Sequence, residues 1–375
     1  MIISNNKISA IKSPVSILYL RLMLIVYFCQ VTISFMKQKP CYILGIESSC
    51  DDTAAAILNH NKVLSNCISN QKIHMQYGGV VPELASRAHQ LNIIPVVDQA
   101  LKKANITQNQ LSAIAYTQGP GLLGSLLVGN SFAKSMAMGL NIPLIGVNHM
   151  QAHILVHFIN EKKSLIPGFP FIGVNVSGGH TQILIVRNYF DMEIIGTTID
   201  DAIGEAFDKC GKKMGLDYPS GPIIDKLSKT GNPKKFLFPV PKVKGLDVSY
   251  SGCKTAFVNF IEKEKYKNSK FINENINDLC SSIQSTLIKI ITQKIEMAVQ
   301  KTGINCVAIG GGVSANSKIR DFLNEKRKIS GWKIHIPSIE YTTDNAAMIG
   351  IAGYYNWKNK NFSDFSSVAN SRMSF

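Results

Sequence analysis

The 375-residue sequence has few acidic side chains, 25 against 40 lysines and arginines, which leaves a formal charge of +15 at pH 7. This balance disfavours an acidic or neutral macromolecular partner and favours a polyanion such as nucleic acid, with general solubility as the alternative explanation. The basic residues are spread over several segments rather than gathered in one stripe. The charge therefore indicates a class of partner without locating its surface.

The eight cysteines include no CxxC pair and no spacing typical of a zinc finger. We therefore expect reduced thiols, as in the cytoplasm, rather than disulfides or structural zinc. Long low-complexity tracts are also lacking, which excludes a largely disordered chain. The length indicates about two domains.

Two glycine turns, SGGHT at 177–181 and GGGVSAN at 310–316, depart from the standard nucleotide motifs. Neither turn matches the P-loop pattern GxxxxGK[ST] or the GxGxxG dinucleotide fingerprint. The sequence has no HExxH motif, because Met150 and Gln151 stand between the histidines where the protease needs its glutamate base. These absences disfavour the two common nucleotide-binding folds and weaken a metalloprotease interpretation.

One apolar run, VSILYLRLMLIVYFCQVTISFM at 15–36, is almost long enough to span a membrane, although Arg21 interrupts it. We interpret it as an over-extended translation start, with Met36 opening the ordinary chain. A signal peptide, a membrane anchor or organellar targeting are the alternatives. We expect the cytoplasm as the location and no membrane partner.

Two hairpins with the same plan indicate an internal duplication. YILGIES, SCDD and TAAAIL read as strand, turn and strand, and FIGVNVSGGHTQILIV at 171–186 repeats the plan. A strand, a glycine turn and a helix follow in each half, at 113–138 and at 307–323. This alternation predicts an α/β fold of two related domains around a cleft. A long helix at about 276–301 is also expected.

The segment GVNHMQAHILVH at 146–157 places three histidines four residues apart. On a helix His149 and His153 share one face and can offer two imidazoles to one ion, whereas His157 continues that face. Ordinary hydrogen-bonded histidines are the alternative. Asp344, at a later strand-to-helix junction, would complete a facial triad of two histidines and a carboxylate, which suits non-haem iron.

Glycine turns and carboxylates supply further candidates. SGGHT at 177–181 and GGGVSAN at 310–316 can present backbone N–H groups to an anion, the second more strongly because a helix follows. Asp51 and Asp52 lie in the first turn, where they either form the turn or, at a cleft, hold a cation or orient a nucleophile. We expect Asp200 and Asp201 to cap the helix beginning DDAIGEAF.

Nine segments in order resemble the TsaD family of tRNA threonylcarbamoyladenosine synthases, over about residues 41–356. They are GIESSCDDTAAAI, GGVVPELASRAH, GPGLLGSL, NHMQAH, VSGGHTQ, DDAIGEAFDK, GLDYPSGP, GGVSAN and TTDNAAMIG. The ESSCDDT segment resembles the bacterial and organellar branch. Many members have Glu where Asp52 stands, so the carboxylate here has a shorter reach.

The resemblance implies the actin/Hsp70-like (ASKHA) fold. The expected parts are an extension at 1–40, a first domain at 41–147 completed by a helix near 343–357, and a second domain at 148–342 with an insert at about 188–280. The implied reaction transfers threonylcarbamoyl from threonylcarbamoyl-AMP to N6 of the adenosine just after the anticodon, in tRNAs that read codons beginning with A.

The resemblance also implies roles for single residues. His149, His153 and Asp344 would hold one divalent metal ion per subunit, Fe²⁺ in preference to Zn²⁺, with Asp51 and Asp52 as catalytic candidates. The implied substrate-binding residues are Asn175, Val176, Ser177, Gly178, Gly179, Asp208, Gly221, Asp225 and Asn316.

Partners and competing functions follow from the same likeness. The expected partners are tRNA and threonylcarbamoyl-AMP, with TsaB and TsaE if the chain is bacterial, or a second copy in a homodimer if it is organellar. The competing functions are a metalloprotease acting on glycoproteins and a nucleotide-binding kinase or chaperone-like module of the same fold.

Overall fold

The computed structural model describes residues 23, 39–160 and 166–375. The chain divides into two compact units, Met1–Pro40 and Cys41–Phe375. The apolar run at 15–36, for which we expect an extended start, lies outside the described residues except for Met23. Among the helices that are described, none is long and apolar enough to cross a membrane.

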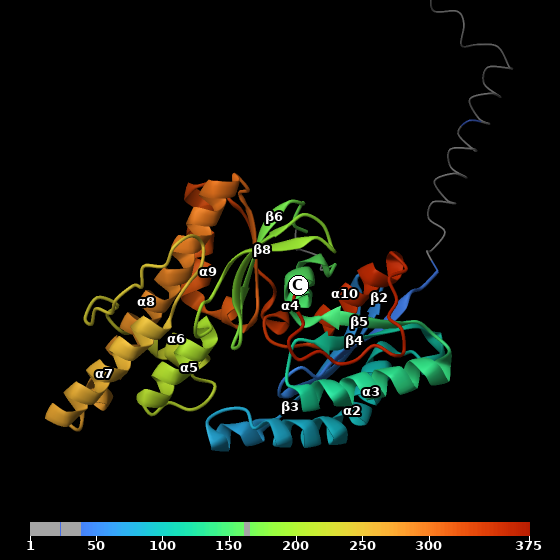
Figure 1. Cartoon of the computed structure of the whole chain (residues 1–375), viewed down its shortest axis with the longest axis horizontal. Coiled ribbons are helices and arrows are strands. Elements are labelled where there is room, and N and C mark those ends of the chain that lie inside the picture. The colour runs from blue at the N-terminus through green and yellow to red at the C-terminus, as the bar shows by residue number, and fades with distance from the viewer. Residues whose placement is uncertain (1–22, 24–38, 161–165) are drawn as a thin grey trace, which may run out of the picture. The chain divides into compact units, whose positions relative to one another are not determined.

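The described part of Cys41–Phe375 contains two five-stranded sheets of identical topology (Figure 1). The first has the order β3-β2-β1-β4-β5, with β1 antiparallel to β2 and parallel to β4. The second has the order β8-β7-β6-β9-β10, and β6 takes the place of β1. The predicted duplication is therefore confirmed in the backbone.

The strands of the first sheet are β1 (Tyr42–Glu47), β2 (Asp52–Asn59), β3 (Lys62–Asn70), β4 (Leu111–Gly119) and β5 (Leu144–Asn148). Those of the second are β6 (Phe171–Val176), β7 (Thr181–Val186), β8 (Met192–Thr197), β9 (Cys306–Gly310) and β10 (Lys333–His335). Most are apolar on both faces because both faces are covered.

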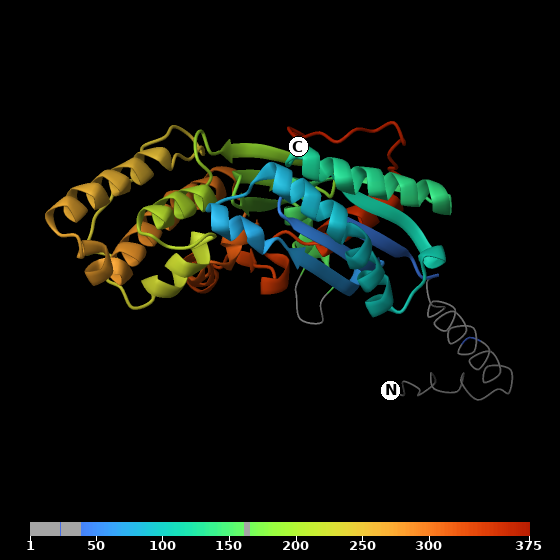
Figure 2. The same cartoon turned by 90° about the horizontal axis from the view of Figure 1, so that it is seen from below.

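Helices α2 (Pro82–Ala104) and α3 (Leu123–Leu140) cover one face of the first sheet (Figure 2). Helices α4 (His149–Leu155) and α10 (Ala346–Lys358) lie between the two sheets, in a core that takes side chains from both. The other side of the second sheet packs against α5 (Ile203–Lys213), α7 (Ser251–Lys267), α8 (Phe271–Thr302) and α9 (Ser317–Ile329), and α6 (Ser220–Ser228) packs on α5 and α8. Short 3₁₀ turns complete the order: η1 (Lys72–Tyr77), η2 (Gln108–Gln110), η3 (Val156–Phe158), η4 (Gly312–Ala315) and η5 (Ile339–Tyr341).

A glycine lets α10 approach the first sheet closely. A Cβ on Gly45, in the middle of β1, would lie 2.4 Å from the carbonyl oxygen of Ala346 and 2.7 Å from the nitrogen of Gly350. Any side chain there would push the helix away, so glycine is required by the approach of the two backbones. Asp344 stands two residues before α10 and is thereby held near the end of β1.

Two local predictions have different outcomes. The long helix expected at about 276–301 is α8, and it begins five residues earlier than predicted. The capping prediction for Asp200 and Asp201 is wrong, because the N-cap of α5 is Ala202. Asp200 instead accepts hydrogen bonds at the start of α7, from the backbone N–H of Tyr250 at 2.8 Å and from the Ser249 hydroxyl. These donors lie 50 and 49 positions away in the sequence, whereas capping rules consider only neighbouring residues.

Candidate metal centre and substrate cavity

The two histidines of interest open helix α4. Strand β5 ends at Asn148, whose side chain accepts hydrogen bonds from the backbone N–H groups of Met150 at 2.9 Å and Gln151 at 3.2 Å. This cap fixes the start of the helix at His149. His153 follows one turn later, so both rings project from the same face. The helix pair predicted from the spacing is confirmed.

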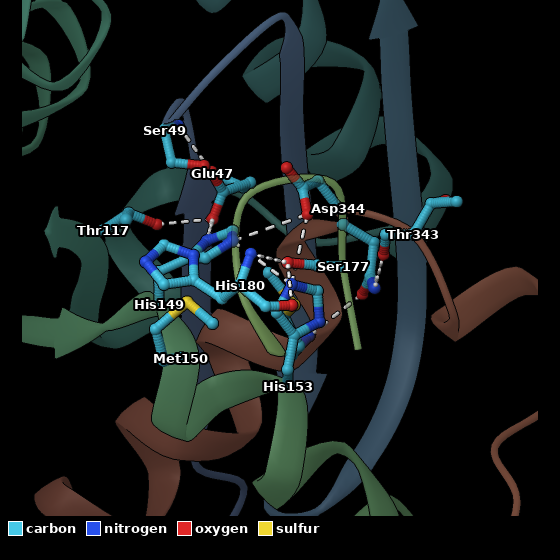
Figure 3. A network of polar contacts seen from close by, with 12 residues as sticks. Glu47, Ser49, Thr117, His149, Met150, His153, Ser177, His180, Thr343 and Asp344 are labelled. Atoms are coloured by element: carbon cyan, nitrogen blue, oxygen red, sulfur yellow. Dashed lines mark hydrogen bonds and ion pairs between the residues drawn. The ribbon is translucent and has the colours of Figure 1, made fainter. Parts of the chain in front are cut away.

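Asp344 meets these two rings in space (Figure 3). Its Oδ1 lies 3.5 Å from Nε2 of His149 and 3.2 Å from Nε2 of His153, and the two Nε2 atoms are 3.2 Å apart. Ligand atoms bonded to one ion at about 2.0–2.2 Å lie about 3–3.5 Å from one another. The three residues therefore fit a single metal ion, and within the described residues they are the group of His, Cys, Asp and Glu side chains that could hold one.

His157 does not join this cluster. It lies on η3, and its Nε2 is 2.9 Å from the carbonyl oxygen of Ile309, to which it donates. Burial lowers the pKa of His157 to about 4, so the ring is neutral at pH 7. This third histidine is a hydrogen-bonded core residue that ties the helix end to β9.

Glu47, whose role the sequence did not indicate, contacts the side of the His149 ring away from Asp344. Glu47, the last residue of β1, is fully buried, and its Oε2 lies 3.0 Å from Nδ1 of His149 (Figure 3). Its other donors are the Thr117 hydroxyl at 2.6 Å and the backbone N–H of Ser49 at 2.5 Å. The signal that could have found it is a charged residue at the end of the apolar strand YILGIE.

The carboxylates of Glu47 and Asp344 and the imidazole of His149 shift one another's pKa values. Burial alone lowers the pKa of His149, but the carboxylates of Glu47 and Asp344 outweigh it and hold that pKa well above its ordinary value. Burial raises the pKa of Asp344, but the two imidazoles outweigh it and hold that pKa far below its ordinary value. The site therefore stabilises positive charge between two carboxylates.

A cavity of about 650 Å³ opens beside this cluster. Its walls combine both hairpin turns with the starts of α6 and α9. The lining residues with side chains or turns that can act on a substrate are Asp51, Asp52, His149, Ser177, Gly178, Gly179, His180, Asp208, Gly221, Asp225, Asn316 and Asp344. Such a volume accommodates a nucleotide-sized ligand.

Three predicted substrate residues on this wall also hold the local backbone. Asp208 accepts from the backbone N–H of Ser220 at 2.8 Å, and Asp225 accepts from the Ser317 hydroxyl at 2.7 Å. Asn316 caps α9 by accepting from the N–H of Lys318 at 3.0 Å. These contacts place the N-termini of α6 and α9 at the cavity, where backbone N–H groups favour an anion.

Asn175 and Val176 lie behind the turn rather than on the cavity wall. Both are fully buried at the end of β6. The Asn175 amide donates to the backbone carbonyl of Met150 at 3.2 Å, while its Oδ1 is buried without a hydrogen-bond partner in the described structure. They support the turn Ser177–Gly179, and a direct substrate contact for either remains a prediction.

The first hairpin turn presents its two aspartates to the cavity. Asp52 begins β2, and its Oδ1 accepts from the side-chain amide of Asn70 at 2.6 Å. Burial, followed by the charge of Asp344, raises the pKa of Asp52 to about 7. His89 of α2 holds this turn through the Cys50 carbonyl at 3.0 Å and the Thr53 hydroxyl at 2.7 Å.

His180 is a second residue that sequence reasoning passed over, although it belongs to the SGGHT turn. It is half-buried at the cavity wall, close to the metal cluster (Figure 3). Burial, followed by His149 and His153, lowers its pKa, so the ring is neutral at pH 7 and one ring nitrogen can accept a hydrogen bond.

The sequence matches one family over most of its length. The family model described as TsaD, tRNA N6-adenosine threonylcarbamoyltransferase, matches residues 62–351. A protein of that name from Christiangramia forsetii is 60% identical over 340 residues, which are 91% of this chain and 100% of the relative. One from Riemerella anatipestifer is 58% identical over 337 residues, 90% of this chain and 98% of the relative.

Among solved structures, full-length HypF in its phosphate- and nucleotide-bound form is similar, with a TM-score of 0.56 at 14% identity. The match covers 87% of this chain but only 48% of HypF, so the chain spans about half of that protein. At this identity the likeness indicates a shared fold.

Proposed function

Because the chain belongs to the TsaD family of tRNA N6-adenosine threonylcarbamoyltransferases, we propose that His149, His153 and Asp344 bind one divalent metal ion beside its substrate cavity. The family depends on metal in general. The observation that carries the proposal is the convergence of three ligand atoms within 4.8 Å of one another at the cavity edge.

The activity itself follows from the family. The chain is an acyltransferase that attaches threonylcarbamoyl to N6 of adenosine in tRNA and so forms t6A. Its fold is the actin/Hsp70-like arrangement of two related α/β domains. The protease and the kinase or chaperone-like alternatives are not favoured by the relatives.

We prefer Fe²⁺ as the ion, with Zn²⁺ as the second choice, because two imidazoles and one carboxylate leave open positions that suit non-haem iron. When bound, such an ion would act as a Lewis acid able to polarise the carbamoyl carbonyl. The protein would contribute the three ligands, His149, His153 and Asp344, which converge beside the substrate cavity.

Threonylcarbamoyl-AMP is the proposed donor substrate. Its phosphate and ribose would lie along the turns Ser177–Gly179 and Gly310–Gly312 and the N-terminus of α9, where backbone N–H groups favour negative charge. Asp208 and Asp225 are placed to accept ribose hydroxyls. The adenosine of tRNA would enter unstacked from its neighbours.

We assign proton removal to the first hairpin turn. The exocyclic amine of adenosine is a weak nucleophile, so positioning and proton transfer must supply much of the rate. Asp52, with a pKa raised to about 7, suits a general base near neutral pH, and Asp51 is its neighbour on the same wall.

The remaining proposals concern partners and organisation. tRNA is the acceptor, in keeping with the charge of +15. TsaB and TsaE are the proposed protein partners in a bacterium, or a second copy of the chain in an organelle, with the cytoplasm as the preferred location. We place the boundary between the two domains at about residues 147 and 148.

The metal centre is tested by ion content and activity together. Wild type purified with iron should retain about one ion per chain and transfer threonylcarbamoyl from synthetic threonylcarbamoyl-AMP to tRNA, whereas Asp344→Ala should lose both. Mass spectrometry of tRNA nucleosides from depleted cells should show loss of t6A. A metal-free wild type with full transfer would contradict the proposal.

A further inference from the structure

We propose that Glu47 is a positioning residue for the metal centre, because its carboxylate fixes the ring of His149 so that Nε2 faces the ion. The inference rests on the proposed metal centre and extends it. Glu47 is not one of the three ligands, and its role would be to hold one of them.

The geometry assigns the proton on His149. Nδ1 of His149 lies 3.0 Å from Glu47 Oε2, and an ionised carboxylate can only accept a hydrogen bond. Nδ1 therefore donates to this carboxylate, and Nε2 is the nitrogen left to bind an ion. That atom faces His153 Nε2 at 3.2 Å. A carboxylate behind a metal-binding imidazole commonly fixes the ring and raises the basicity of the ligand nitrogen.

Glu47 is itself rigidly held. It is fully buried at the end of β1. Its two oxygens accept from the Thr117 hydroxyl on β4 and from the backbone N–H of Ser49 in the turn, besides His149 on α4 (Figure 3). Donors from three different segments fix the carboxylate, so the position of the imidazole is set by the sheet.

The negative charge of Glu47 also favours a cation at the metal centre. Within the described residues, His149 is the ion-pair partner found for Glu47, and no lysine or arginine contacts it. A buried carboxylate without a permanent cation is costly unless another positive charge offsets it. Glu47 and Asp344 together carry two negative charges around His149, which one bound divalent cation would neutralise.

The second histidine is held differently. Nδ1 of His153 is buried and has no hydrogen-bond partner in the part of the chain that is described. The polar contacts of His153 are on Nε2, with Asp344 Oδ1 and His149 Nε2 at 3.2 Å each, and its backbone packs closely on Gly310. Removal of the Glu47 carboxylate should therefore loosen His149 and leave His153 unchanged.

The test is a titration of metal-free protein with Co²⁺, followed by its visible absorption. Glu47→Gln replaces one acceptor oxygen by an NH₂ group that faces a donor, and it should bind Co²⁺ about 10–100-fold more weakly with an altered spectrum. Thr117→Val, which removes one donor to the same carboxylate, should change both readouts in the same direction by less. The exposed Glu325→Gln is the matched control and should behave as wild type.

Circular dichroism of the metal-free proteins separates folding from positioning. A folded Glu47→Gln with the affinity and spectrum of wild type would overturn the inference. If Glu47→Gln does not fold, Thr117→Val decides, and wild-type binding by that variant overturns it. A wild type that binds no Co²⁺ would refute the metal centre itself, which distinguishes that failure from failure of Glu47 alone.

Discussion

Burial of Asp52, the proposed general base, has opposite consequences for catalysis and for stability. Its carboxylate lines the cavity, where burial and the charge of Asp344 raise its pKa to about 7. A base with such a pKa is partly ionised at neutral pH and accepts a proton more readily than an ordinary aspartate. The same burial makes the ionised form costly to the folded protein.

We expect Asp52→Asn to lower transfer from threonylcarbamoyl-AMP by roughly 10²–10⁴-fold, the contribution typical of a general base. In wild type the rate should rise with pH through about 7, because only the ionised carboxylate accepts the proton. This limb should disappear in the variant. The exposed Asp321→Asn should keep the wild-type profile, and an unchanged pH profile in Asp52→Asn would remove the role.

The stability of the same variant should change in the opposite direction. The folded-state pKa is raised, so the contribution of Asp52 to stability is complete below about pH 4 and is lost as pH rises through about 7. Asp52→Asn should therefore raise the Tm relative to wild type at pH 8 and leave it nearly unchanged at pH 4. Thermal scans at the two pH values measure this, and equal Tm differences at both would argue against a raised pKa.

The helix α4 shows that elements, as well as residues, are positioned by close contacts. A Cβ on Gly310, at the end of β9, would lie 2.2 Å from the carbonyl oxygen of His153. The end of β9 thus touches the backbone of His153, one of the three proposed metal ligands. Neither element can shift without the other.

We therefore expect Gly310→Ala to destabilise the protein by about 1–3 kcal/mol, as overpacking does, and to weaken metal binding by displacing His153. Gly139→Ala on α3 is the control, because nothing lies within 4 Å of its added Cβ. That change should be neutral or slightly stabilising. Denaturant unfolding and Co²⁺ titration measure both effects, and equal behaviour of the two variants would contradict the close contact.

At the scale of the whole molecule, the charge of +15 links the chain to its polyanionic substrate. If the protein contacts about 6–10 phosphates of the tRNA, its affinity for tRNA should fall about 10³–10⁵-fold between 50 and 200 mM salt. Fluorescence anisotropy with labelled tRNA at several salt concentrations gives the slope. An affinity that barely changes would show that the basic residues serve solubility instead.

Much of the fold could be predicted from the sequence, because strand patterns and residue spacings depend on neighbouring residues. Two hairpins with the same apolar pattern predicted two related sheets, and the four-residue spacing predicted that His149 and His153 share a helix face. Asp344 could be added because strand-to-helix junctions gather at one edge of a sheet, and because the resemblance named it.

Only the tertiary structure showed what depends on distant neighbours. In the sequence, Glu47 is only an acidic residue at the end of a strand. In the folded protein it accepts hydrogen bonds from Thr117 and His149, which lie 70 and 102 positions away in the sequence. Asp200 serves α7 rather than its own helix for the same reason. Periodicity and spacing fix what a segment becomes, whereas the protonation, charge balance and partners of a buried group are fixed by which segments the fold brings together.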